Sequence, residues 1–325
     1  MLYRILITRV CGFGSIGWIK AIRAIKSMKI TLYGCDVNAY GYTSGSLLVD
    51  NFIMSPPVEH TRDYANFLCQ ICNQYEIDLL LSVFDDELEL LTEIKDKIKT
   101  HIVLPDMDTI QLFRNKQMAS SAIQQLGIAI PPIITSLFDE SKVIFRPKVS
   151  IGSGGICVVD LSSEQYIPNK FNSNYFLQRF IDGNEYTVDI FADKDGIPKM
   201  IIPRQRLEIK QGVSFKCQIV KKQELIDACI KICEEYFLPG ITNVQFITSN
   251  NENYFIELNP RMGGTAIAGI LASFNYVELF LQNILQEKTL DTFDNYMKCV
   301  AWDSIITRYY EETIFHSGDS SSKMS

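Results

Sequence analysis

Four polar side chains in the last third of the chain have the types and spacing of a magnesium-dependent phosphate site. Gln245 lies in one predicted strand, and Glu257, Asn259 and Arg261 lie on and just after the next one. Alternate side chains of a strand point to the same face, so Glu257 and Asn259 are expected side by side. Oxygen ligands of this kind suit Mg²⁺, with Mn²⁺ as a substitute. Arg261 is then placed to neutralise a transferring phosphate.

Cations beside a glycine loop predict a clamp for phosphates. Arg146 and Lys148 end a strand-like segment, and the loop 151–155 follows, with Lys116 earlier at the start of a predicted helix. Such a loop can close over a nucleotide, although a hairpin turn with exposed cations is the alternative. The next strand pair, over 176–189, can offer backbone groups to an adenine edge, with Glu185 accepting from a ribose hydroxyl.

The N-terminal glycines allow more than one interpretation. Gly12, Gly14 and Gly17 follow a predicted strand and precede a helix, and Asp36 ends the second strand, which is the spacing of a dinucleotide fingerprint. An NAD(P)-dependent oxidoreductase is therefore one alternative. A loop facing a small anionic substrate and a purely structural tight turn are the others. The oxidoreductase interpretation leaves the polar residues over 115–261 unexplained.

Alternating segments position these residues. Strand-like and helical stretches alternate over the first hundred residues, which predicts a doubly wound parallel sheet. Strands and hairpins dominate from residue 142, with a helix over 224–237, a hairpin around Asn250–Asn251 and a mostly helical stretch over 266–286. The polar segment 317–325 is expected to be disordered. We expect domains over 1–112, 113–182, 183–290 and 291–325.

Six motifs in order resemble the ATP-grasp superfamily, and are most similar to the branch of carbamoyl phosphate synthase large subunits and the pyrrolysine-biosynthesis ligase. Together they cover about residues 1–285, and the last one is the most distinctive. The motifs are Asn115–Lys116, FRPK at 145–148, GSGG at 152–155, the segment 178–185, NVQ at 243–245 and IELNPR at 256–261.

The resemblance implies a fold and residue roles. It implies a Rossmann-like N-terminal domain followed by a two-lobed ATP-grasp fold with α/β (α+β) lobes, and catalytic roles for Lys116 and Arg261. Arg146 stands where many relatives have a lysine, which keeps the charge but not the contact geometry. The expected ATP-binding residues are Lys116, Arg146, Lys148, Gly152, Ser153, Gly154, Gly155, Gln178, Arg179, Phe180, Ile181 and Glu185. The expected metal ligands are Gln245, Glu257 and Asn259, and the substrate candidates are Gly12, Phe13, Gly14, Arg204 and Arg206.

These residues favour a ligase that uses ATP and Mg²⁺ to activate a carboxylate as an acyl phosphate for attack by an amine. A non-catalytic nucleotide-binding relative is a further alternative. The net charge of −7 gives no basic footprint for nucleic acid, and no apolar run reaches membrane-spanning length. Nine cysteines without a secretion signal predict a reducing, cytoplasmic location. The expected partners are small-molecule carboxylates and amines, and a homodimer is left open.

Overall fold

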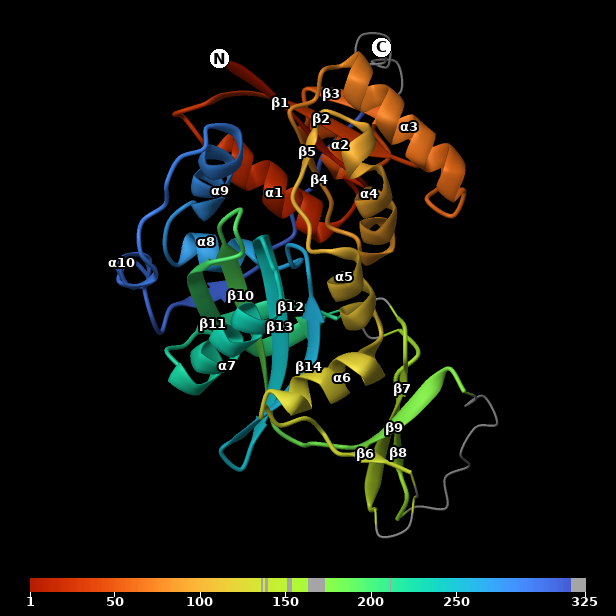
Figure 1. The fold of residues 1–325 in the computed structure, drawn as a ribbon, viewed down its shortest axis with the longest axis vertical. Helices are drawn as coiled ribbons and strands as arrows, with labels where there is room; N and C mark the ends of the chain where they lie inside the picture. The colour runs from red at the N-terminus through yellow and green to blue at the C-terminus, as the bar shows by residue number, and fades with distance from the viewer. Residues whose placement is uncertain (136, 138–139, 151–153, 163–172, 211, 317–325) are drawn as a thin grey trace.

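The computed structural model describes residues 1–135, 137, 140–150, 154–162, 173–210 and 212–316. Within these residues the strands form three sheets, so the predicted α/β class is confirmed. Figure 1 shows the N-terminal sheet at the top, the largest sheet below it and a small sheet at the lower right. No helix in the described ranges combines the length and apolar composition needed to cross a bilayer.

The N-terminal sheet is parallel, and the described strands lie in the order β3-β2-β1-β4-β5. Helices cover both faces, because Ile5 and Ile7 pack in the core that contains α1, whereas Leu6 packs in the core that contains α3. The strands are β1 (Leu2–Ile7), β2 (Lys29–Asp36), β3 (Asn51–Met54), β4 (Leu79–Leu81) and β5 (His101–Ile102). The helices are α1 (Phe13–Arg23), α2 (Ser44–Leu48), α3 (Thr61–Gln74) and α4 (Leu88–Ile94), with the 3₁₀ turns η1 (Asp85–Glu87) and η2 (Lys95–Lys97).

The charged segment after β4 forms only a short α-helix. Only the apolar stretch of α4 is α-helical, and η1 and η2 flank it. The reason on the N-terminal side is that Glu87 turns into the protein interior. The short elements α2 and β3 were not predicted, because their sequence lacks a long periodic pattern.

Two capped helices lead into the small sheet. Asp106 accepts a hydrogen bond from Thr109 N (2.8 Å) to cap α5 (Met107–Arg114), and Asn115 accepts two (both 3.2 Å) to cap α6 (Lys116–Gln125). The small sheet is antiparallel, with the described strands in the order β6-β9-β7-β8. Its strands are β6 (Ile133–Ile134), β7 (Lys142–Pro147), β8 (Cys157–Asp160) and β9 (Tyr175–Arg179).

The largest sheet holds described strands in the order β14-β13-β10-β11-β12-β15, all antiparallel. The predicted hairpin is β13–β14, and Asn250 and Asn251 both have the positive φ that its two-residue turn requires (49° and 63°). The strands are β10 (Asn184–Ala192), β11 (Pro198–Lys210), β12 (Val213–Ile219), β13 (Gly240–Ser249), β14 (Glu252–Asn259) and β15 (Ile305–Thr307). The helices are α7 (Gln223–Glu235), α8 (Ile267–Leu271), α9 (Tyr276–Leu285) and α10 (Phe293–Met297).

The domain boundaries expected from the sequence can be compared with the positions of the helices and strands. Residue 112 falls within α5, and residue 182 falls between β9 and β10. The stretch predicted as mostly helical over 266–286 consists of α8 and α9. β15 pairs with β12, so part of the expected C-terminal extension belongs to the largest sheet. The four-part division stays a prediction.

Candidate active site

One face of the largest sheet gathers the polar residues, and we call it the polar face. The pairing of the strands determines which side chains share this face, since Gln245 lies opposite Glu257 and Asn243 lies opposite Asn259. Directly opposed residues of antiparallel strands share a face. The pairing continues into β10 and β11. The polar face comprises Glu185, Thr187, Asp189, Arg204, Arg206, Asn243, Gln245, Glu257 and Asn259.

A lysine and a glutamate from distant segments pair at the edge of this face. Lys116 begins α6, which packs against β14, and its Nζ lies 2.9 Å from Glu257 Oε2. The two side chains are only 8% and 12% exposed. Burial acts to raise the pKa of Glu257, but Lys116 and then Arg146 outweigh it, so the pKa lies below its ordinary value. A buried, charged pair therefore joins a predicted phosphate ligand to a predicted metal ligand.

Arg146 reaches the same edge from β7 of the small sheet. Its Nη1 donates to Gln178 Oε1 (3.0 Å), and both Nη atoms donate to the carbonyl oxygen of Ile256 (3.3 Å each). Its Nε is buried and has no hydrogen-bond partner among the described residues. Burial lowers the pKa of Arg146, and Glu257 opposes that shift. A buried cation with an unused donor is suited to an incoming anion.

The other predicted metal ligands lie beside this pair. Asn259 Nδ2 donates to Asn243 Oδ1 (3.2 Å) and lies 3.4 Å from Glu257 Oε1. Gln245 Oε1 accepts from Arg206 Nη1 (3.2 Å). No three His, Cys, Asp or Glu side chains in the described ranges gather closely enough to hold a metal. A cation here would rely on one carboxylate with amide oxygens and phosphate oxygens, which is a donor set that fits Mg²⁺.

Arg261 links this edge to the N-terminal sheet. It follows β14 directly, and its Nη2 lies 2.6 Å from Asp85 Oδ2 in η1 and 3.4 Å from Asn259 Oδ1. Its Nε is also buried without a hydrogen-bond partner among the described residues. Asn243 Nδ2 donates to the carbonyl oxygen of Arg261 (3.1 Å), which fixes the start of the following turn. Asp85 and Asn243 were not predicted as site residues, although an acidic run after a parallel strand is a usable signal for the first.

Glu185 and Arg206 pair on the polar face. Arg206 Nη1 lies 2.9 Å from Glu185 Oε2, and the Glu185 side chain is 43% exposed. Arg204, the other predicted basic substrate residue, is only 2% exposed and pairs with Asp189 at 2.7 Å, with Nη1 donating to Ser214 (3.3 Å). Its three donor atoms are thus engaged inside the protein, so a direct contact with substrate would require this pair to open.

The predicted adenine segment and glycine loop are described in part. The side chain of Gln178 is buried between Arg146 and Pro131 O, whereas Arg179 is exposed and pairs with Glu140. Phe180 stacks under Lys142 (4.2 Å). The Lys148 carbonyl accepts from Lys116 N (2.7 Å), which ties the base of the loop to α6. Of the loop glycines, Gly154 and Gly155 are described, Ile181 lies just after β9, and Gly152 and Ser153 fall outside the described residues.

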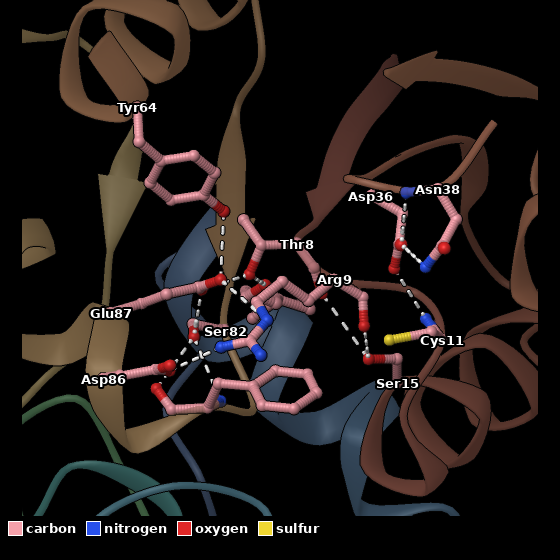
Figure 2. Close-up of polar contacts among 12 residues, drawn as sticks. Thr8, Arg9, Cys11, Ser15, Asp36, Asn38, Tyr64, Ser82, Asp86 and Glu87 are labelled. Atoms are coloured by element: carbon pink, nitrogen blue, oxygen red, sulfur yellow. Dashed lines mark hydrogen bonds and ion pairs between the residues drawn. The ribbon is translucent and has the colours of Figure 1, made fainter. Parts of the chain in front are cut away.

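The N-terminal glycine turn is used for packing. A Cβ at Gly12 would lie 2.7 Å from the Phe84 ring, and one at Gly14 would lie 3.1 Å from Val83. Figure 2 shows Asp36 between the glycine turn and its own loop: it accepts from Cys11 N of the turn (3.0 Å) and from Asn38 N and Nδ2 of the loop (3.0 and 2.7 Å). Asp36 is only 1% exposed. Its oxygens are therefore committed internally, and the NAD(P) interpretation is not favoured.

The same view shows a second buried carboxylate. Glu87 is fully buried and accepts from Thr8 (2.6 Å), Ser82 (2.7 Å) and Tyr64 (2.9 Å), with Arg9 Nε at 3.9 Å (Figure 2). Burial raises its pKa, and the hydroxyl hydrogen bonds offset this in part. We call these residues the hydroxyl cage. It joins the ends of β1 and β4 and supports the η1 turn that carries Asp85.

Sequence families match two parts of the chain. A model described as "ATP-grasp in the biosynthetic pathway with Ter operon" matches residues 172–302, and one described as "PylC-like, N-terminal domain" matches residues 16–104. The tyramine–L-glutamate ligase of Methanocaldococcus jannaschii is 29% identical over 251 residues, which cover 74% of this chain and 75% of that protein.

Two further proteins are similar over different extents. The arginine-specific carbamoyl phosphate synthase large chain of Bacillus subtilis is 27% identical over 135 residues, but these cover only 38% of this chain and 13% of that protein. The biotin carboxylase domain of the Hydrogenobacter thermophilus 2-oxoglutarate carboxylase, solved with MgADP, ADP and bicarbonate, superposes with a TM-score of 0.71 at 12% identity. That match covers 94% of this chain and 74% of that one.

Proposed function

Because this chain belongs to the ATP-grasp superfamily and is similar to its carboxylate–amine ligase branch, we propose that it is an ADP-forming ligase. It would use ATP and Mg²⁺ to activate a carboxylate as an acyl phosphate, which an amine then attacks to form a C–N bond. The observation that carries this proposal is the buried Lys116–Glu257 pair, with Arg146 beside it.

The charges around Glu257 support the nucleotide and metal roles. Gln245, Glu257 and Asn259 would hold Mg²⁺, which when bound supplies charge neutralisation to the phosphate oxygens. Lys116 and Arg146 would then bind ATP phosphates, so that Lys116 exchanges its contact with Glu257 for one with phosphate. Arg261 is held near by Asp85 and would contact the γ-phosphate. The remaining ATP contacts predicted from the sequence, including the adenine segment and Glu185, form part of the same proposal.

The reaction then needs position and charge more than a protein nucleophile. An oxygen of the substrate carboxylate attacks the γ-phosphorus, the bond from that phosphorus to the β–γ bridging oxygen breaks, and ADP leaves. The amine nitrogen next attacks the acyl carbon, phosphate departs with the carboxylate oxygen, and the nitrogen loses a proton. The small sheet and its glycine loop would exclude water from the acyl phosphate. The name of the M. jannaschii relative, which pairs an amine with an amino acid, agrees with this class of reaction.

Trapping of the acyl phosphate tests the proposal. A panel of carboxylic acids is screened for stimulation of ADP release, and each active acid is then incubated with hydroxylamine in place of the amine. The proposal expects a hydroxamate from wild type and a sharply lower yield from Lys116→Ala and Arg261→Ala. Arg114→Ala, an exposed arginine on α5, serves as the matched control. An acid that stimulates ADP release without any hydroxamate formation would count against carboxylate activation.

A further inference from the structure

One arginine outside both matched sequence ranges enters the candidate site. Arg308 follows β15, and its backbone N donates to Phe215 O (3.0 Å), which continues the pairing with β12. Ile306 lies opposite Cys217, so alternation places Arg308 on the face that Cys217 shares with Arg206. Arg308 thus extends the polar face to the end of β15. In the described strand order, β15 and the strand of Glu257, β14, are the two opposite edges of the sheet.

Its guanidinium lies between the first residue of α1 and the turn that follows Arg261. Nη2 donates to the carbonyl oxygen of Gly264 (2.6 Å), in the turn that follows Arg261. The guanidinium carbon lies 5.5 Å from the centre of the Phe13 ring, and that ring is half exposed. Burial lowers the pKa of Arg308, and the nearby charge of Arg204 lowers it further. The charged form of this side chain is therefore destabilised both by burial and by a neighbouring cation.

Three other arginines at this end of the site each pair with an acid. Arg204 pairs with Asp189, Arg206 with Glu185, and Arg261 with Asp85. No carboxylate in the described part of the chain lies within ion-pair distance of Arg308. A half-buried guanidinium near an arginine and without a carboxylate is stabilised when an anion arrives, and its planar fork suits a carboxylate in particular.

The position of Arg308 separates it from the phosphate end. In the proposed function, Lys116, Arg146 and Arg261 provide the cations for the transferring phosphate. Gly264 is three residues beyond Arg261, and three residues of backbone span at most about 10 Å. A short molecule could therefore place one carboxylate near Arg261 and a second anionic group at Arg308.

We propose that Arg308, held between Phe13 and Gly264, binds a second anionic group of the acid substrate, so that the substrate class is a short dicarboxylate. This inference rests on the proposed function, since the first carboxylate is the one that is phosphorylated. Phe13, a substrate candidate from the sequence, would form the apolar wall beside that group. Arg308 is then a specificity residue at the end of the site opposite to the nucleotide.

Binding measurements on paired probes test this assignment. Succinate, glutarate, L-aspartate and L-glutamate are each compared with their monoamides, by calorimetry in the presence of Mg²⁺ and a non-hydrolysable ATP analogue. Wild type is expected to prefer at least one diacid over its amide by about tenfold or more, the effect of one charge-assisted contact. Arg308→Gln should remove the preference for the diacid over its amide, whereas Arg308→Lys, which keeps the charge, should retain part of it. Arg62→Gln, an exposed arginine on α3, should behave as wild type.

Two results separate this inference from the proposed function. If the nucleotide analogue binds normally, but wild type shows no diacid preference or Arg308→Gln keeps it, the assignment of Arg308 is wrong and the ligase proposal stands. If a diacid binds through Arg308 but the nucleotide analogue does not bind, the ligase proposal fails and the anion site stands. Nucleotide affinity in Arg308→Gln within about twofold of wild type would show that the fold of the site is intact.

Discussion

Glu87 and Glu257 are both carboxylates withdrawn from water, and the protein holds them in opposite ways. Glu87 is 0% exposed and is surrounded by three neutral hydroxyl donors, with Arg9 at a longer distance. Glu257 is 12% exposed and contacts the Lys116 cation directly. As a result, the pKa of Glu87 is raised, whereas that of Glu257 is lowered.

This difference separates a structural carboxylate from an exchangeable one. The hydroxyls of the cage carry no charge that a ligand could replace, and they join the ends of β1 and β4 to the helix α3 that covers this sheet. Lys116 and Glu257 come from segments 141 residues apart and each carries a charge that a nucleotide or a metal can take over. A buried ion pair adds little net stability compared with apolar packing, so this pair suits a role in binding better than a role in stability.

The largest expected effect is on turnover, at Glu257. Glu257→Gln keeps the shape of the side chain but removes the charge proposed to hold Mg²⁺, so ADP release should fall by on the order of 100-fold. Lys116 loses its anionic partner, which should also cost about 1–3 kcal/mol of stability. ADP release and urea unfolding measure the two effects. Glu252→Gln, at the start of the same strand, is the control, and normal turnover in a folded Glu257→Gln protein would remove the metal assignment.

The next effect is on stability, at Glu87. Glu87→Ala leaves three buried hydroxyls without their acceptor and should lower the free energy of unfolding by roughly 3 kcal/mol. Turnover per folded molecule should change far less than in Glu257→Gln. The milder Glu87→Gln keeps an acceptor oxygen and should cost less than the alanine. If Glu87→Ala instead lost turnover without losing stability, the cage would have to be part of the catalytic site.

The pH dependence of these two glutamates should have opposite signs. The raised pKa of Glu87 adds to the free energy of unfolding at low pH. This contribution is complete below the unfolded-state pKa and is lost as pH rises through the folded-state pKa. The lowered pKa of Glu257 adds to the free energy of unfolding at higher pH. This contribution is present above the unfolded-state pKa and is lost as pH falls through the folded-state pKa. Urea unfolding of wild type, Glu87→Gln and Glu257→Gln from about pH 3, below the ordinary glutamate pKa of about 4.3, to about pH 8 measures both. Slopes of the same sign for the two differences from wild type would contradict the comparison.

The smallest expected effect is at Asp85, which holds Arg261 from the N-terminal sheet. Asp85→Asn removes a partly exposed ion pair, so stability should fall by less than about 1 kcal/mol. Turnover should change by only a few-fold, because Arg261 keeps its contact near Asn259. Steady-state kinetics with Asp86→Asn as the control checks this, since Asp86 pairs with Arg9 instead. A loss as large as that of Glu257→Gln would make Asp85 part of the catalytic machinery.

Local patterns in the sequence predicted the elements better than the contacts between them. The β13–β14 hairpin and the shared face of Glu257 and Asn259 followed from alternation and from Asn250–Asn251. Contacts between side chains far apart in the sequence did not follow from such patterns. Nothing local indicates, for example, that Asp85 contacts Arg261, which lies 176 residues further along the chain. Arg308 was missed for a similar reason, since its place depends on β15 joining the largest sheet. The spacing of Asp36 suggested a cofactor ligand, whereas its oxygens bind the adjoining loop.

Transfer of oxygen from the acid to phosphate tests the central proposal most directly. An acid that stimulates ADP release is labelled with oxygen-18 in its carboxylate, and the phosphate released in the presence of an amine is analysed by ³¹P NMR. If the carboxylate is activated as an acyl phosphate, the phosphate must carry one labelled oxygen from the acid, and Glu257→Gln should lower the rate at which this phosphate forms. Phosphate without label, released at the same rate as ADP, would contradict carboxylate activation.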